Sequence, residues 1–329
     1  MTNGTSQGLF IVVAIIIFGI FTLTSYVLFK DNLKPTLANI FTNGFNQANT
    51  ALNKGSILEN NINTDESNST IYNNQLYVKI REKNEAKNET EVWVLLEELK
   101  DGTYAIKASG IDNTSPNYDI QGYSTGLSGS SSMTGDLILP DTINGKKITL
   151  IKESAFYFSK FNGQLTLPKY LQSIEACAFG YSNFRGSLTL PDSLQSIGNN
   201  AFECSEFTGS LTLPDSLQSI GSGAFYCSKF TGSLTLPNSL QSIGSSAFIY
   251  SNFSGSLTLP DSLQSIGQYA FNFSYFSGTL DISNVTNIEY YAFGNSEIST
   301  VKNDSLNNNN KTIDRNAIRM DDGSYYRIN

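Results

Sequence analysis

The chain has 329 residues, a net charge of -8 and only 15% charged residues, so a nucleic-acid-binding surface is not expected. It contains no histidine, which excludes Ser-His-Asp and Cys-His catalysis, His-ligated metals and His-based pH switches. Its three cysteines are too few and too widely spaced for a disulfide-rich scaffold or a zinc cluster. We therefore expect no cofactor, no bound metal and no enzymatic activity.

The first feature along the chain is an apolar segment. A polar leader, residues 1–7, precedes the uncharged and mostly apolar residues 8–29, and the first charge is Lys30. At about 1.5 Å per residue, a helix of this length spans a hydrocarbon core of about 30 Å. The leader has no Lys or Arg, and no small-residue cleavage site ends the segment. We therefore predict a retained transmembrane helix rather than a cleaved signal.

The charges around this segment leave its orientation open. Lys30 and Lys34 follow the segment, so the positive-inside rule alone would place the C-terminal side in the cytoplasm. Large domains translocate largely regardless of such charges. The character of the repeats in the second half of the chain favours an extracellular location for them.

The start of the chain resembles the N-terminus of type IV pilin-like proteins. In that family a short polar leader ends in Gly and an apolar helix begins at once, as at Gly8-Leu9-Phe10 here. The resemblance implies cleavage after Gly8 and packing of the helix into a filament. The sequence departs from the family pattern in two ways, because the leader is not basic and Val13 stands where the family has Glu.

A polar stretch and two apolar runs come next along the chain. Residues 30–74 are rich in Asn, Ser and Thr and are predicted to form a stalk or linker. Residues 75–80 alternate as a strand does, and the second run contains the only tryptophan, Trp93, which we place in a core. We interpret residues 75–100 as a small β-containing segment, either a separate module or a cap on the repeat region.

A 23-residue repeat occupies the second half of the chain. The prolines of its Leu-Thr-Leu-Pro signature are Pro168, Pro191, Pro214, Pro237 and Pro260. A fixed period of this length is typical of a solenoid, in which each unit buries its apolar face only against its neighbours. We predict a β-rich solenoid of about six to seven short coils at residues 151–300, with an N-terminal cap at 101–150 and a C-terminal cap or tail at 301–329.

The pattern within one coil predicts which side chains are buried. Leu188 and Leu190 flank Thr189 with period two, so the leucines should point inward and the threonine outward. Pro191 ends this strand because it cannot donate a backbone hydrogen bond. Ile197 returns to the core in a second short extended segment. Two phenylalanines per coil should then form buried ladders along the solenoid.

Two cysteines lie in one column of the repeat. Cys204 and Cys227 each follow a repeat phenylalanine by two residues, so they should stack one coil apart. The same column otherwise holds Phe158, Tyr181, Tyr250 and Phe273. We expect an apolar, largely buried column in which the thiols are the small members. A disulfide between the two coils is also conceivable, since neighbouring strands lie about 4.8 Å apart.

Two exposed ladders are candidate binding features. The outward threonines form a hydroxyl array that is a candidate face for sugars, peptides or ice: Thr166, Thr189, Thr212, Thr235 and Thr258. Thr is also simply a good exposed strand residue. A second ladder of side-chain oxygens, on Asp192, Asp215, Asn238 and Asp261, would suit a divalent cation, although turn chemistry explains it equally well.

The repeat C-S-x-F-x-G-S-L-T-L-P-x-S-L-Q-S-I-G-x-x-A-F resembles the BspA-like leucine-rich repeat of bacterial surface proteins. The resemblance spans roughly residues 101–300 and implies a leucine-rich repeat solenoid with an irregular first unit. It departs from the family in using Phe where Leu is frequent. Members of the family are typically surface-exposed and implicated in adhesion or protein binding.

These observations lead to one functional expectation with two alternatives. We expect a bacterial protein anchored in the cell membrane through residues 8–29, with an extracellular, non-catalytic solenoid that binds a protein or glycan ligand. The first alternative is a pilin-like structural subunit of a surface filament that the repeats decorate. The second is a scaffold that faces the cytoplasm.

Overall fold

The computed structural model describes residues 61–62, 69–72, 75–89, 91–110, 134–303 and 311–327. The chain forms two compact units, Met1–Leu58 and Glu59–Asn329, and all the described residues belong to the second. The predicted leader, the apolar segment 8–29 and the Gly8 junction lie outside them. Among the described residues, no helix is both long and apolar enough to cross a membrane.

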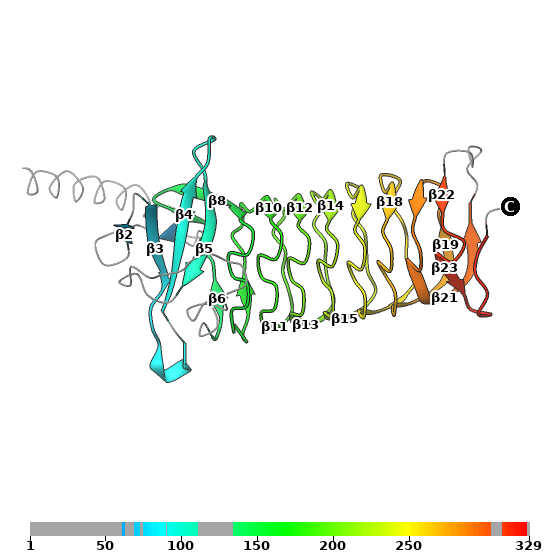
Figure 1. Cartoon of the computed structure of the whole chain (residues 1–329), viewed down its shortest axis with the longest axis horizontal. Coiled ribbons are helices and arrows are strands. Elements are labelled where there is room, and N and C mark those ends of the chain that lie inside the picture. Colours follow the sequence, from blue (N-terminus) through cyan, green and yellow to red (C-terminus); the bar gives the residue numbers. More distant parts are fainter. Residues whose placement is uncertain are drawn as a thin grey trace, which may run out of the picture. The chain divides into compact units, whose positions relative to one another are not determined.

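The second unit forms the predicted parallel β-solenoid of about seven turns, which continues past the predicted end at residue 300 into the segment predicted as a cap or tail (Figure 1). One strand of each turn joins the main sheet, in the order β10 (Ser173–Ile174), β12 (Ser196–Ile197), β14 (Ser219–Ile220), β16 (Ser242–Ile243), β18 (Ser265–Ile266), β20 (Asn287–Ile288) and β22 (Thr312–Ile313). All six pairings are parallel and in register, so each residue lies beside its equivalent in the next turn.

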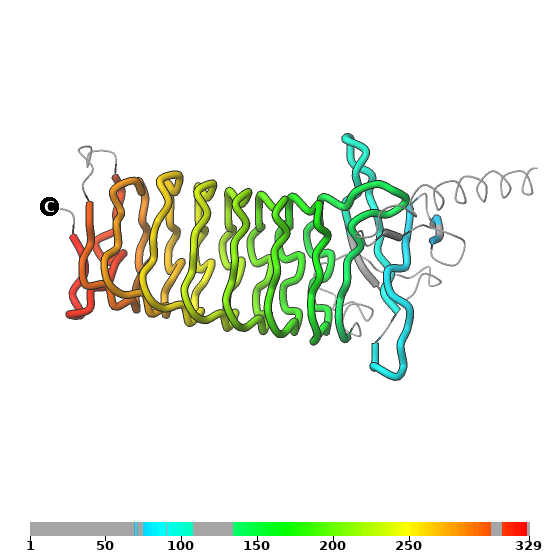
Figure 2. Tube along the Cα trace, turned by 180° about the vertical axis from the view of Figure 1, so that it is seen from behind, coloured from blue at the N-terminus to red at the C-terminus, as the bar shows by residue number. Residues whose placement is uncertain are grey.

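A second sheet of seven strands lies on another side of the coils. Its strands are β11 (Arg185–Gly186), β13 (Glu206–Gly209), β15 (Lys229–Gly232), β17 (Asn252–Gly255), β19 (Tyr275–Asp281), β21 (Phe293–Lys302) and β23 (Ile318–Met320). A short third sheet pairs β6 (Leu137–Ile138) with β9 (Leu165–Thr166). The trace in Figure 2 shows the successive turns stacked side by side from one end of the unit to the other.

The apolar runs at residues 75–100 form the cap of the solenoid. The antiparallel strands β2 (Ser69–Tyr72), β3 (Gln75–Arg81), β4 (Val92–Glu98) and β5 (Tyr104–Gly110) extend the main sheet. Strand β5 pairs in parallel with β8 (Lys146–Ile151), which pairs with β10. The short strand β7 (Thr142–Ile143) pairs with β8 and also with β1 (Asn61–Ile62). A 3-10 turn, η2 (Glu85–Lys87), connects β3 and β4. The segment is therefore continuous with the solenoid rather than a separate module.

The predicted tryptophan core in this cap is confirmed, but it is small. Trp93 is only 4% exposed and packs in a cluster with Tyr77 and Leu95. This cluster is distinct from the main core, to which the alternate β4 residues Val92, Val94 and Leu96 contribute. The side chains of β4 therefore cover both faces of the cap sheet.

Two ladders of stacked phenylalanines form the centre of the solenoid. The first runs from Phe156 to Phe293, and its neighbouring rings stack with centroids 5.2–5.4 Å apart. The second runs from Phe161 to Phe276 with centroid separations of 5.5–6.2 Å. Within each coil, the two phenylalanines meet edge to face, at 5.7 Å for Phe225 and Phe230. The ladders predicted from the repeat are confirmed.

The structure corrects the predicted position of the main strands. Leu188 and Leu190 are buried and Thr189 is exposed, as predicted. This segment nevertheless forms only isolated bridges to the next coil, while the continuous sheet is made by the Ser-Ile pairs. Pro191 ends the segment after three residues, so it is too short to make an extended ladder.

A glycine column lets neighbouring coils approach closely. The glycines after the strand isoleucines, such as Gly221 and Gly244, have φ angles outside the left-handed region. A Cβ atom on Gly221 would lie 2.5 Å from the backbone nitrogen of Asn199 in the preceding coil, and one on Gly244 would lie 2.4 Å from that of Ser222. Glycine is therefore required here by crowding rather than by backbone conformation.

A column of buried serines lies between the two phenylalanines of each coil. Ser159 and Ser182 hydrogen-bond through their Oγ atoms, which are 3.0 Å apart. In the central coils the Oγ atoms of Ser205, Ser228 and Ser251 are buried and have no hydrogen-bond partner among the described residues. Serine therefore fits this position because its side chain is small, and not because its hydroxyl group makes a hydrogen bond.

We predict that Phe225→Ala in the middle of the first ladder lowers the free energy of unfolding by about 3–5 kcal/mol. The ring is fully buried and stacks on Phe202 and Phe248, so its removal leaves a cavity that neither neighbour can fill. Urea unfolding of the purified chain measures the change. Phe273→Ala is the matched control, because the Phe273 ring is 38% exposed and its loss should cost less than about 1.5 kcal/mol. Equal losses in the two variants would contradict the ladder's role.

Candidate functional site

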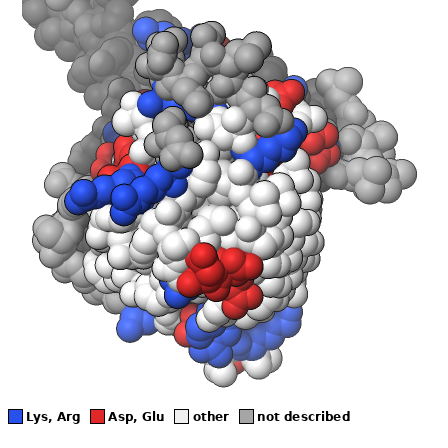
Figure 3. Space-filling view, turned by 90° about the vertical axis from the view of Figure 1, so that its right-hand side faces the viewer, with Lys and Arg blue, Asp and Glu red and all other residues white. Residues whose placement is uncertain are grey.

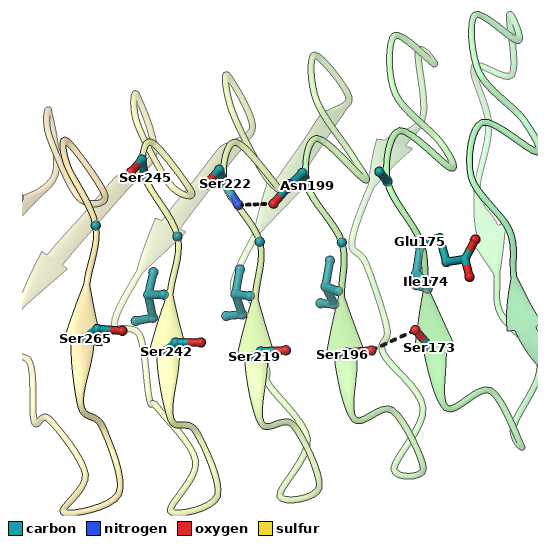
Figure 4. A pocket seen from close by; sticks show the side chains of 18 of the residues that line it. Ser173, Ile174, Glu175, Ser196, Asn199, Ser219, Ser222, Ser242, Ser245 and Ser265 are labelled. Carbon is teal, nitrogen blue, oxygen red and sulfur yellow. Dashed lines mark hydrogen bonds between the residues drawn. The ribbon is translucent and has the colours of Figure 1, made fainter. Parts of the chain in front are cut away.

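The outer face of the main sheet carries an open groove that runs across β10, β12, β14, β16 and β18 (Figure 4). Its cavity volume is about 710 Å³. One serine per strand lines it: Ser173, Ser196, Ser219, Ser242 and Ser265. The glycine column and a column of small polar residues that includes Asn199, Ser222 and Ser245 line its other part.

The local sequence explains why a groove forms here. In each strand the serine alternates with a buried isoleucine, so the hydroxyl must point away from the core. After β12, β14, β16 and β18 the next residue is a crowded glycine, which places no side chain over the sheet, whereas Glu175 follows β10. Because the serines are small and the glycines have no side chain, this face of the sheet is hollow over several coils.

The groove repeats hydrogen-bonding groups at the strand spacing. The Oγ atoms of Ser173 and Ser196 lie 2.7 Å apart, and either can donate to the other. The Asn199 side-chain oxygen accepts a hydrogen bond from the Ser222 backbone nitrogen at 2.8 Å. Serine hydroxyls both donate and accept, and neighbouring strands lie about 4.8 Å apart. The groove therefore offers an extended ligand one polar contact per coil.

The charges along the groove are acidic and lie at its ends. No Lys or Arg is among the residues that line it, whereas Glu153 and Glu175 lie at one end and Glu289 at the other. The Glu175 carboxylate accepts from the Glu153 backbone nitrogen at 3.0 Å, and that of Glu289 accepts from the Gln268 backbone nitrogen at 2.9 Å. An end-on view of the C-terminal side shows a mostly uncharged surface with a few separate charged groups (Figure 3). This groove disfavours a polyanionic ligand.

The predicted threonine ladder lies outside this groove. Thr166, Thr189, Thr212, Thr235 and Thr258 are exposed and belong to the Leu-Thr-Leu-Pro side of the coil. Isolated bridges join Thr189 to Thr212 and Thr212 to Thr235. Ligand binding at these threonines stays a prediction. The groove serines could have been found from the same period-two alternation of polar and apolar residues that exposes the threonines. For the serines this alternation lies in the Ser-Ile segment of the coil, and for the threonines in the Leu-Thr-Leu segment.

The ladder of side-chain oxygens lies in the turns of successive coils. Asp192, Asp215, Asn238 and Asp261 are exposed, and Asp261 accepts a hydrogen bond from the Asn284 side chain at 2.5 Å. Within the described ranges, no three His, Cys, Asp or Glu residues converge as a metal site would require. The ladder is accounted for by turn chemistry.

The prediction of a buried aromatic and cysteine column was wrong. Phe158, Tyr181, Tyr250 and Phe273 are 38–47% exposed, and the two cysteines are partly exposed. All these residues have φ between 56° and 66°, the left-handed conformation. This turn directs the side chain out of the coil, although it follows a buried phenylalanine by only two residues. The column is an exposed edge of the solenoid rather than part of its core.

Hydrogen bonds and burial shift two pKa values along this edge. The Tyr181 hydroxyl donates to the Glu203 carboxylate at 3.0 Å, which raises the pKa of Tyr181 to about 12. Partial burial, and then the neighbouring Cys227, raise the pKa of the Cys204 thiol to about 11. Both groups are therefore protonated at neutral pH.

These features define a class of protein: a leucine-rich repeat solenoid with a polar groove along its main sheet. Residues 149–274 and 208–321 match the BspA type leucine rich repeat region, in six copies. Together the two stretches cover 173 of the 329 residues. The chain belongs to this family.

Three solved structures show similarity to the chain. A leucine rich repeat protein of T. pallidum is 20% identical, with a TM-score of 0.42 over 67% of this chain and 86% of that one. A leucine-rich repeat protein from Bacteroides ovatus is 16% identical, with a TM-score of 0.31 over 76% and 78%. The pneumococcal vaccine antigen PcpA is 17% identical, with a TM-score of 0.28 over 73% and 78%. No curated protein matches the chain.

Proposed function

We propose that this protein is a membrane-anchored bacterial surface protein whose solenoid binds an extended protein or glycan ligand without catalysis. The observation that carries the proposal is the groove of about 710 Å³, which presents a polar contact from each successive coil. A ligand whose polar groups repeat at the spacing of the coils can make many weak contacts at once, and together these contacts give polyvalent attachment. The apolar residues 8–29 serve as the membrane anchor.

The chemistry of the groove favours a particular kind of ligand. Serine hydroxyls and amide groups suit hydroxyl-rich or peptide chains, which supply both donors and acceptors. The carboxylates of Glu153, Glu175 and Glu289 repel phosphate and sulfate groups. Nucleic acid and highly sulfated polymers are therefore disfavoured, and neutral glycans or extended peptides with few acidic residues are favoured.

We predict that filling the groove abolishes this binding. The double variant Ser219→Trp/Ser242→Trp places two indoles over the central strands, and affinity for the best ligand of an immobilised glycan and peptide array should fall at least about tenfold. Surface plasmon resonance measures the loss. Thr212→Trp/Thr235→Trp adds the same bulk to the threonine ladder and should leave affinity within about twofold. A loss confined to the threonine variant would assign binding to that ladder instead.

The proposed extracellular location predicts that antibodies against the repeats label intact cells. Flow cytometry before and after permeabilisation measures the accessible fraction, with a cytoplasmic protein as the control. Labelling that appears only after permeabilisation would exclude surface display. It would favour the cytoplasmic scaffold instead.

The Gly8-Leu9-Phe10 junction supports the pilin-like filament subunit as a second candidate function. Cleavage after Gly8 predicts a mature protein that begins at Leu9. Intact-mass measurement of the protein isolated from its membrane distinguishes the two candidates. A start at Met1 or Thr2 contradicts the filament subunit and leaves the membrane-anchored form.

A further inference from the structure

The exposed edge of the solenoid contains two cysteines that face each other across one coil boundary. The Cys204 backbone nitrogen donates to the Tyr226 oxygen at 2.9 Å, and the Cys227 nitrogen donates to the Ile249 oxygen at 3.2 Å. In a parallel ladder the donor residue lies opposite the residue that follows the acceptor, as the register of the main sheet also shows. Cys204 therefore lies opposite Cys227, and Cys227 opposite Tyr250.

The backbone at the two cysteines is nearly identical. Their φ angles are 56° and 62°, so both Cα–Cβ bonds leave the coil in a similar direction. Both cysteines lie in turns that hydrogen-bond to the next coil as parallel strands do. Strands paired in this way lie about 4.8 Å apart, within the range of about 4.4–6.8 Å between Cα atoms that a disulfide spans. Both thiols are free and partly exposed. The two thiols can therefore reach each other, and a small reagent can reach both of them.

We propose that Cys204 and Cys227 form a reversible disulfide that joins two neighbouring coils, made by exchange with a small-molecule disulfide. The thiol of one cysteine loses its proton to solvent, and its sulfur attacks a sulfur of the small disulfide, which gives a mixed disulfide and releases one small thiol. The second protein thiolate then attacks the protein sulfur of the mixed disulfide, forms the Cys204–Cys227 bond and releases the second small thiol. The two protein thiols lose two protons and two electrons, and the small disulfide accepts both electrons.

The geometry also explains why this bond would be reversible. Both cysteines are partly exposed, so a disulfide between them lies within reach of small thiols. Accessible disulfides are the easily reduced ones. The linkage closes a loop of one repeat in the middle of the solenoid, where it opposes separation of the coils.

The third cysteine is an internal control. The Cys177 backbone nitrogen donates to the Asn199 oxygen at 2.8 Å, which places Cys177 opposite Asn200 rather than opposite a thiol. Cys177 is also partly exposed, so a small disulfide has access to it as it has to the pair. The difference between Cys177 and the pair is the presence of a facing sulfur.

The test uses the full-length protein in detergent, reduced and then titrated with oxidised glutathione. Peptide mapping by mass spectrometry should show the Cys204–Cys227 linkage, with Cys177 either free or carrying glutathione. The Cys204→Ser variant should accumulate glutathione on Cys227, because no second thiol can release it. The melting temperature of the oxidised wild type should rise by roughly 5–10 °C, and this rise should persist in Cys177→Ser but not in Cys204→Ser.

Three results would overturn the proposal. Stable glutathione adducts on both Cys204 and Cys227 would show that the two sulfurs do not meet. Disulfide-linked dimers on a non-reducing gel would assign the thiols to contacts between chains. Unchanged thiols at a glutathione disulfide concentration that modifies Cys177 would show that the pair is not reactive. Circular dichroism of the serine variants confirms that each remains folded.

Discussion

In the main sheet and in the turns that follow it, backbone hydrogen bonds between neighbouring coils hold each residue beside its equivalent in the next repeat, whereas the second sheet pairs residues 21 positions apart. The Gln195 nitrogen donates to the Gln172 oxygen at 2.8 Å, and the Phe202 nitrogen donates to the Ala224 oxygen at 2.8 Å. Since the bonds recur every 23 residues, any side chain that the repeat specifies becomes a continuous column. Stacked phenylalanines, buried serines, groove hydroxyls and the exposed aromatic edge are all products of this one alignment.

The same alignment decides which residues each column accepts. The coils lie so close at Gly221 and Gly244 that no Cβ atom fits, and this crowding opens the groove above the sheet. At the opposite extreme, the left-handed turn at Tyr181 and Tyr250 points outward, so large rings are tolerated there at no cost to the core. One constraint therefore produces a tightly packed interior, a polar groove and an aromatic edge from the same short sequence.

Much of this structure could be predicted from the sequence, for identifiable reasons. Inward Leu188 and Leu190, the buried phenylalanines and the solenoid itself follow from periodicity, because apolar spacing reports burial directly. Periodicity predicts an extended segment at Ile197, but it cannot tell which of the two extended segments of a coil bonds to the next coil. It therefore does not predict that the Ser196-Ile197 segment forms the continuous sheet with the groove. Nor does it report the left-handed φ of Cys204, and that single angle changes an expected core position into an exposed one.

In-register stacking also bears on how such a chain changes over evolutionary time. Each central coil presents to its successor the same surface that it receives from its predecessor, so the duplication or loss of one whole repeat preserves both junctions. A duplication would lengthen the groove by one serine and one strand spacing of about 4.8 Å. The length of the groove is thus set by repeat number, a quantity that recombination between near-identical repeats can alter in a single step.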